Sequence, residues 1–411
     1  MKKNICQIIL IILILSTPYL TQASKLVPPD NQADDYFGIA ASISSNYAIV
    51  GANHDDDNGS NSGSAYIFKY IANGWQQVTK LLPSDGASSD YFGGAVSMSG
   101  DYAIIGAMYD DVSYSNSGSA YIFKRYGNKW FQEVRINASD LEASDYFGES
   151  VSISGDYAIV GAYQEDTKGS NSGAAYIFKR ENHSWNQLTK LMASDGAADD
   201  QFAYSVHISG NYAIVGSKYD DDYGTNSGSA YIFINSNDVW TQAAKINAMD
   251  GSQDDYFGYS VHISSNYAIV GSPYDDTNGL NSGSAHIFEK NGDNWIHIKT
   301  LMANDRAAQD LFGHQVSISN DYALVSAYQD DDYGSNSGSV YVFKKTGSDW
   351  VLKSSNIVFE TSGSNAITTS TMAGIPLSLS IKISPTPEMY TRTSIISFLI
   401  TDANGLTQTY R

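Results

Sequence analysis

The sequence predicts an all-β fold, a β-propeller of six blades with four antiparallel strands each. Two observations carry this prediction. One tryptophan column and two phenylalanine columns recur every 55 residues, six times, without insertion or deletion. Each 55-residue unit also holds four short apolar runs separated by turn residues, which is typical of consecutive antiparallel strands. The columns are Trp75, Trp130, Trp185, Trp240, Trp295 and Trp350; Phe37, Phe92, Phe147, Phe202, Phe257 and Phe312; and Phe68, Phe123, Phe178, Phe233, Phe288 and Phe343.

In the first unit, strands are expected at residues 37–44, 47–51, 64–68 and 75–82. The turns Ser45–Asn46 and Asn73–Gly74 join the first and the last pair as hairpins. No window shows the 3.6-residue period of an amphipathic helix. Because a blade leaves faces that only its neighbours can cover, the units must stack in a ring. An open β-solenoid has shorter coils and needs no four-stranded unit, so it is the weaker alternative. A seven-bladed ring is also kept open.

Three parts are expected along the chain. Residues 1–23 resemble a secretory signal peptide, with Lys2 and Lys3 before a short apolar run and cleavage near Ala23. That run is too short to span a bilayer, so no membrane insertion is expected of the mature chain. Residues 24–354 form the propeller. Residues 355–411 break the period and predict a β-rich tail, with strands at 374–381 and 395–401 followed by the turn 402–405. The tail is similar to a partial immunoglobulin- or cadherin-like module; a degenerate seventh blade is the alternative.

Composition excludes several classes of protein. The 411 residues include 44 acidic and 24 basic side chains, a formal net charge of −20. Such a charge argues against binding to nucleic acid or to anionic membrane surfaces. With 42% hydrophobic residues the chain can bury a core, so it is not disordered. The single cysteine, Cys6, lies in the expected signal peptide, and the mature protein is predicted to be secreted or displayed at the cell surface without disulfides.

The unit resembles the FG-GAP repeat in three segments: Tyr36-Phe37-Gly38, residues 47–52 (YAIVGA) and residues 63–68 (GSAYIF). That family includes the propeller of integrin α subunits and many bacterial secreted proteins, and the run SDGA at 84–87 is like the bacterial form. The resemblance covers residues 25–354 and implies a propeller. Integrin-like repeats carry a calcium loop of Asp-x-Asp-x-Asp-Gly type between the first two strands. Here that place holds Ser44-Ser45-Asn46, so the family's calcium residues do not transfer.

Most acidic residues fall into four columns of the repeat, which lie in the loop before the first strand and in the loop between the second and third strands. In an up-and-down blade both loops emerge on one face of the disc, which is therefore expected to be acidic. One interpretation is that these side chains cap their own loops. The other is calcium, which prefers several carboxylate oxygens. The columns begin at Asp30, Asp35, Asp55 and Asp56, and the candidate calcium ligands are Asp55, Asp56, Asp57, Asp110, Asp111, Asp220, Asp221, Asp222, Asp275, Asp276, Asp330, Asp331 and Asp332.

One column varies where its neighbours are constant. It follows the Phe-Gly step and is expected to ring the mouth of the central channel on the acidic face. A constant scaffold with different side chains is what a recognition surface requires, although neutral variation gives the same pattern. The column is Ile39, Gly94, Glu149, Tyr204, Tyr259 and His314, and Glu149, Tyr204, Tyr259 and His314 are the candidate ligand-binding residues.

The sequence therefore favours a binding or adhesion module that recognises protein or surface ligands through the acidic face, with or without calcium. A lectin is the first alternative, because the tryptophan column offers sugar-stacking platforms unless it only covers the blade edges. The second is the accessory propeller of a secreted enzyme. No catalytic residue is predicted, because no HExxH, GxSxG or phosphate-binding glycine loop is present. His207 and His262 share a column and are interpreted as drift on a polar strand face, not as a metal pair.

Overall fold

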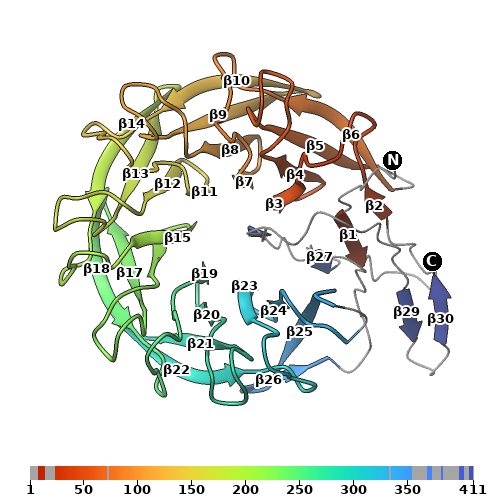
Figure 1. Ribbon diagram of the computed structural model, residues 1–411, viewed down its shortest axis with the longest axis vertical. Coiled ribbons are helices and arrows are strands. Elements are labelled where there is room, and N and C mark those ends of the chain that lie inside the picture. Colours follow the sequence, from red (N-terminus) through yellow and green to blue (C-terminus); the bar gives the residue numbers. More distant parts are fainter. Residues whose placement is uncertain are drawn as a thin grey trace.

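The computed structural model describes residues 24–71, 74–332 and 335–353, and the short strands 8–13, 368–372, 381–382, 398–401 and 407–410. All regular elements in this part of the chain are strands. Six four-stranded antiparallel blades follow one another in chain order around a central axis (Figure 1). The predicted all-β, six-bladed propeller is confirmed.

Blade 1 contains β3 (Phe37–Ser44), β4 (Tyr47–Ala52), β5 (Ser64–Ile71) and β6 (Gly74–Leu81), from the axis outward. The predicted strands are thus found, with the third extended to Ile71. The other blades repeat this order. They are β7 (Ala95–Ser99), β8 (Tyr102–Ala107), β9 (Ser119–Tyr126) and β10 (Lys129–Ile136); β11 (Ser150–Ser154), β12 (Tyr157–Ala162), β13 (Ala174–Glu181) and β14 (Ser184–Leu191); β15 (Phe202–Ser209), β16 (Tyr212–Ser217), β17 (Ser229–Ser236) and β18 (Val239–Ile246); β19 (Ser260–Ile263), β20 (Tyr267–Ser272), β21 (Ser284–Asn291) and β22 (Asn294–Leu301); and β23 (Phe312–Ile318), β24 (Tyr322–Ala327), β25 (Ser339–Thr346) and β26 (Asp349–Leu352).

Short strands from the two ends of the chain accompany the ring. They are β1 (Ile8–Leu13), β2 (Ser24–Leu26), β27 (Thr368–Met372), β28 (Ile381–Lys382), β29 (Phe398–Thr401) and β30 (Thr407–Tyr410). β28 pairs antiparallel with β3 and extends the sheet of blade 1, whereas β29 and β30 pair antiparallel with each other. Of the strand expected at 374–381, only Ile381 is among the described residues, and the turn expected at 402–405 lies outside them. The signal peptide and the immunoglobulin- or cadherin-like tail stay predictions.

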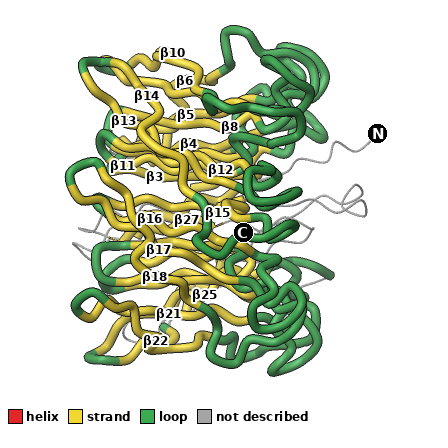
Figure 2. The backbone as a smooth tube through the Cα atoms, turned by 90° about the vertical axis from the view of Figure 1, so that its left-hand side faces the viewer, coloured by secondary structure: helices red, strands yellow, loops and turns green. Residues whose placement is uncertain are grey.

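The two kinds of connection separate onto opposite sides of the disc. Figure 2 shows long loops along one edge of the strands and tight hairpin turns along the other. The long loops are those that precede the first strand of each blade and those between its second and third strands, as at 53–63 in blade 1. These loops carry the acidic columns, and we call this side the acidic face.

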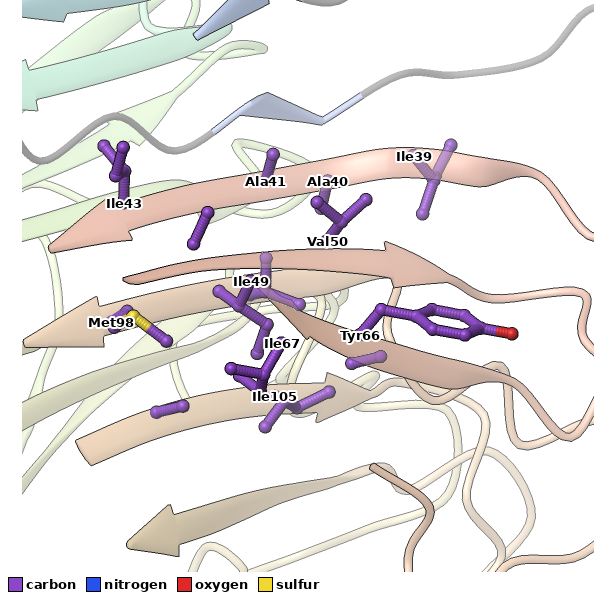
Figure 3. Packing of buried hydrophobic residues seen from close by; sticks show 14 of the residues in the cluster. Ile39, Ala40, Ala41, Ile43, Ile49, Val50, Tyr66, Ile67, Met98 and Ile105 are labelled. Carbon is purple, nitrogen blue, oxygen red and sulfur yellow. The ribbon is translucent and has the colours of Figure 1, made fainter. Parts of the chain in front are cut away.

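Aromatic side chains fill the space between neighbouring blades. In blade 3, Phe147 lies edge-on to Tyr176 and Phe178, with ring centroids 5.6 and 6.0 Å apart, and the three rings are buried against Ile104 and Ile122 of blade 2. Figure 3 shows the equivalent packing around blade 1, where Ile49 and Ile67 meet Ile105 of the next blade. Burying each such ring contributes roughly 2–3 kcal/mol, so the phenylalanine columns are the contacts that hold the blades together.

In blades 2 to 6 the tryptophan column closes the outer part of the junction with the preceding blade. Trp185 of blade 3 contacts Tyr102 of blade 2, with centroids 5.8 Å apart, and Trp240 contacts Tyr157 at the next junction in the same way. Trp350 is only 2% exposed. These indoles cover blade edges, so they do not offer the free faces that a sugar-stacking platform needs.

Next to the axis, side chains of one blade's innermost strand hydrogen-bond to the backbone of the next blade. The hydroxyl of Ser42 accepts a hydrogen bond from the backbone N–H of Met98, at 3.1 Å. His207 and His262 replace this serine in blades 4 and 5, and each accepts the corresponding backbone N–H through Nδ1, at 3.3 and 3.4 Å. Their imidazole rings stack with centroids 3.6 Å apart. The two histidines therefore perform the serine's structural role in a larger form.

Blade spacing depends on a glycine in the second strand. A methyl group on Gly271 of β20 would lie 1.9 Å from the carbonyl oxygen of Gly313 in the next blade, and Gly106 meets Gly148 at the same distance. In blade 6 the position is Ser326, whose hydroxyl instead accepts a hydrogen bond from the N–H of Gln315. Blade 6 is the last FG-GAP-type blade along the chain among the described residues, and it is the one in which this glycine is replaced by serine.

We predict that Gly271→Ala destabilises the protein by at least about 2 kcal/mol, because the new methyl group collides with backbone that cannot move aside. The matched control is Gly100→Ala in an open hairpin turn, where a methyl group meets nothing within 4 Å and φ is +58°. That change should cost about 1 kcal/mol from the left-handed backbone alone. Urea unfolding followed by tryptophan fluorescence measures both. Equal losses would contradict the close approach.

Candidate functional site

The acidic columns lie on the loops of the acidic face, and most of them cap those loops. In the column of Asp35, the carboxylate accepts the backbone N–H three residues earlier, at 2.5 to 2.7 Å in all six blades. In the column of Asp56, it accepts the N–H five residues later, at 2.6 to 2.7 Å in the first five blades. Such bonds satisfy backbone donors that the loop leaves unpaired. The geometry supports the capping interpretation for these residues.

In three blades a lysine ammonium bridges the remaining carboxylates. Lys80 of β6 lies 3.2 Å from Asp30, 2.6 Å from Asp55 and 2.6 Å from Asp57. Burial opposes its charge, but Asp55 and Asp57 raise the pKa of Lys80 above its ordinary value. Lys190 and Lys245 make the equivalent bridges in blades 3 and 4, while Arg135 pairs with Asp85 in blade 2. In these blades a side chain supplies the positive charge for which the sequence suggested calcium.

Blades 5 and 6 differ. Blade 5 has Thr300 at the lysine position. In blade 6 the hydroxyl of Tyr341 donates to Asp305 and Asp330, at 2.7 and 2.9 Å, as Tyr231 does to Asp195 and Asp220 in blade 4, but no lysine bridge accompanies it among the described residues. Burial raises the pKa of the adjacent Asp332, and the neighbouring carboxylates raise it further. Among the residues that the structure describes, no three metal-ligating side chains are arranged to hold an ion. The candidate calcium ligands therefore do not form a shared site here, and calcium stays a prediction.

In the Asp35 column, burial and neighbouring carboxylates disfavour the ionised form of the side chains. Burial, together with nearby carboxylates of the same blade, raises the pKa of Asp90, Asp145, Asp200 and Asp310 to about 6. The pKa of Asp255 rises to about 7, because burial is reinforced by Asp275, Asp276 and Asp250. Lysines thus neutralise some carboxylates of these loops, whereas the carboxylates of the Asp35 column keep a raised pKa.

The variable column lies at the axial end of the acidic face, as expected. Glu149, Tyr204 and Tyr259 line a cavity of about 60 Å³ together with residues of the innermost strands. His314 does not line it but meets Tyr259, whose hydroxyl is 3.3 Å from its Nε2. Ile39 is buried. The structure thus brings four of the candidate residues to one place, without testing whether a ligand binds there.

Sequence reasoning missed a larger feature of the same face. Aromatic rings follow one another from blade 1 to blade 6, each with its centroid 4.1 to 5.8 Å from the next. We call this series the aromatic collar. Most of its rings are half-buried, so their edges and parts of their faces reach solvent. Its members are Tyr36, His54, Tyr91, Tyr109, Tyr146, Tyr163, Tyr204, Tyr259, His314 and Tyr328.

Together the ring of blades, the one-sided acidic loops and the aromatic collar define a repeat β-propeller with a single differentiated face. The FG-GAP repeat profile matches residues 20–68, 75–123, 130–178, 185–233, 240–288 and 295–343, which is more than half of the chain. The protein therefore belongs to the FG-GAP repeat family. No curated protein is similar enough to the chain to add a second comparison.

The family repeat and the blade are out of phase. The matched segment 75–123 contains β6, the outermost strand of blade 1, followed by β7, β8 and most of β9 of blade 2. Each repeat after the first thus contributes its first strand to one blade and its other three to the next.

We predict that Lys80→Met lowers the free energy of unfolding by about 2–4 kcal/mol, because three carboxylates lose their shared cation in a site where the lysine side chain is 14% exposed. Lys69→Met is the control, since Lys69 forms no ion pair in the described part of the chain and contacts only the side chain of Asn128 and the ring of Tyr47 there, and it should change stability by less than about 1 kcal/mol. Urea unfolding at pH 7 compares the two. A loss no larger than the control's would show that the bridge contributes nothing.

Asp255 predicts a pH dependence of stability. Its pKa in the folded protein, about 7, exceeds the ordinary value near 4. The favourable contribution is thus complete below pH 4 and is lost as the pH rises toward 7. Replacing Asp255 by Asn removes this loss, so the stability of the variant relative to the wild type should increase between pH 4 and pH 8 by about 1–2 kcal/mol. Asp293→Asn, in an exposed turn, should show no such trend. Urea titrations at several pH values test this, and a flat difference for Asp255→Asn would be incompatible with the raised pKa.

Proposed function

We propose that the protein is an extracellular or cell-surface binding module whose ligand engages the aromatic collar at the axial end of the acidic face. The observation that carries this proposal is the collar itself. Packing between blades is completed by the phenylalanine and tryptophan columns, so the fold does not need a further series of half-exposed rings. Tyrosine offers large contact area and a polar hydroxyl at a small entropic cost, which suits recognition.

The differences between blades support binding and not merely assembly. The scaffold keeps its glycines, phenylalanines and loop caps in every unit, while the collar draws its rings from different positions in different blades. A surface that contacts a ligand is expected to vary in this way on a constant scaffold. A protein or surface ligand is our first candidate, as the sequence suggested, with the acidic loops setting which charges approach.

A glycan is the second candidate, and a specific observation favours it. Tyr204 and Tyr259 lie beside the small cavity at the axis, with centroids 5.3 Å apart, and Glu149 lines the same cavity. Tyrosine faces beside a carboxylate acceptor suit a sugar ring with its hydroxyl groups. The lectin alternative thus moves from the tryptophan column to the collar.

The extracellular location is proposed from the N-terminal segment, with its two lysines and short apolar run. No helix able to cross a membrane occurs in the part of the chain that the structure describes. An FG-GAP propeller is consistent with a binding module, and we propose no catalytic residue. An accessory role beside a secreted enzyme is compatible with the same face.

We predict that Tyr91→Ala combined with Tyr109→Ala weakens binding to cells or to a glycan array at least tenfold, because both changes remove collar rings. Tyr126→Ala is the control, since Tyr126 is 58% exposed at a hairpin on the opposite side of the disc. Binding is measured by flow cytometry with labelled protein, in calcium and in chelator. Protease treatment of the cells should abolish binding to a protein ligand, and periodate should abolish binding to a glycan. Equal binding by the collar variant and the wild type would refute the proposal.

A further inference from the structure

One residue at the collar is unlike its equivalents in every other blade. Lys218 follows β16 directly, and the corresponding residues are Asn53, Met108, Tyr163, Pro273 and Tyr328. Lys218 is only 9% exposed. A lysine is seldom buried to this extent unless a partner offsets its charge. Blade 4 places this basic side chain among the rings of the collar.

The surroundings of Lys218 are aromatic and not acidic. Its Nζ lies 3.3 Å from the ring centroid of Tyr204, 4.7 Å from that of Tyr219 and 5.5 Å from that of Tyr259. Within the described part of the chain, Lys218 forms no ion pair, although Lys80, Lys190 and Lys245 form two or three each. The tyrosine faces stabilise a cation only partly. The ammonium is therefore buried without a counter-charge.

This arrangement is costly in the free protein. Burial lowers the pKa of Lys218 to about 7. The effect reaches a neighbour, because burial and then the charge of Lys218 lower the pKa of His314 to about 4. A buried cation without a partner gains most from an anion that arrives with a ligand. Two of the rings beside Lys218, those of Tyr204 and Tyr259, belong to residues that line the cavity at the axis, although Lys218 itself does not line it.

We propose that the Lys218 ammonium anchors the carboxylate of a uronic-acid sugar whose ring lies against the tyrosines of the collar. A single ammonium matches one negative charge, whereas a phosphate usually meets several cations or an arginine fork. The sugar ring packs on Tyr204 and Tyr259, and the carboxylate of Glu149 accepts hydrogen bonds from sugar hydroxyls. This inference rests on the proposed function, with a glycan as the ligand. It adds that the glycan carries a negative charge.

The pH dependence of binding follows from the groups that surround Lys218, which are Tyr204, Tyr219, Tyr259 and His314. Burial raises the pKa of Tyr204 and Tyr219 above 10, and His314 titrates near pH 4. Among Lys218, Tyr204, Tyr219 and His314, Lys218 is thus the one that changes charge between pH 5 and pH 9, while Asp200 and Asp255 of the acidic loops ionise around pH 6 to 7. A carboxylate binds the charged ammonium, so affinity should fall above pH 7, by up to about tenfold per pH unit, and this fall should be absent in Lys218→Met. Binding above pH 7 should also take up a proton.

The probes are D-glucuronate, its methyl ester and D-glucose, titrated by ligand-observed NMR against the wild type, Lys218→Met and Lys290→Met. The control Lys290 also lies over a tyrosine, Tyr212, with Nζ 5.1 Å from the ring centroid, but outside the collar. The wild type and Lys290→Met should bind glucuronate at least tenfold more tightly than either neutral sugar at pH 6. Lys218→Met should lose this preference while melting at a temperature no lower than the wild type. N-acetylglutamate should bind at least tenfold more weakly than glucuronate.

Four results would overturn the inference. They are equal binding of glucose and glucuronate, an unchanged preference in Lys218→Met, affinity that does not fall between pH 7 and pH 9, and binding of N-acetylglutamate as tight as that of glucuronate. Each leaves the proposed function standing if the collar variant Tyr91→Ala, Tyr109→Ala still loses cell or glycan binding. Retention of that binding instead removes the proposed function itself, so the two failures are distinguishable.

Discussion

The rest of the structure depends on the burial of aromatic rings between neighbouring sheets. A four-stranded blade has two apolar faces and no helix to cover them, so each blade is stable only beside another. Phe147 with Tyr176 and Phe178, packed on Ile104 and Ile122, shows the arrangement that recurs from junction to junction. Glycines such as Gly271 then allow the backbones to come close enough for these rings to be enclosed. Because packing fixes the blades, the loops at their ends are free to carry polar and charged groups.

On the acidic face, the side chains of these loops both cap backbone N–H groups and form ion pairs with lysines. Their carboxylates accept backbone N–H groups that the turns leave unpaired, and Lys80, Lys190 and Lys245 return positive charge to the clusters so formed. The balance is incomplete, as the raised pKa of Asp255 shows. The face is thus strongly acidic at its periphery while its axial end is aromatic and holds a single buried lysine. Within each repeat, the acidic residues and the collar rings occupy different positions, and they therefore lie on different parts of the face.

The sequence predicted the repeat, the order of the strands and the side on which the acid lies, because a fixed period and turn residues determine these directly. It predicted the column of Tyr204, Tyr259 and His314 as a group for the same reason. The collar was not predictable in this way. Its rings come from four positions of the repeat, and Tyr109 in blade 2 and Tyr163 in blade 3 occupy neighbouring positions. Lys218 resembles an ordinary loop lysine in the sequence, since its burial arises from tyrosines supplied by separate strands. Lys80 meets Asp30 across 50 residues, a contact that spacing alone does not reveal.

Because the family repeat and the blade have different boundaries, the unit that recurs in the sequence is not the unit that forms one sheet. A copied repeat ends with an outermost position that its own strands do not fill, and it supplies the missing strand of its predecessor. A chain built in this way can lengthen or shorten by whole repeats, and every interior blade remains complete. At the two ends of the array this pattern stops: β26 lies after the last matched segment, and β28 joins β3. Adding or removing whole repeats therefore leaves the interior blades unchanged. The contacts that close the ring must then be made by segments at the two ends of the array.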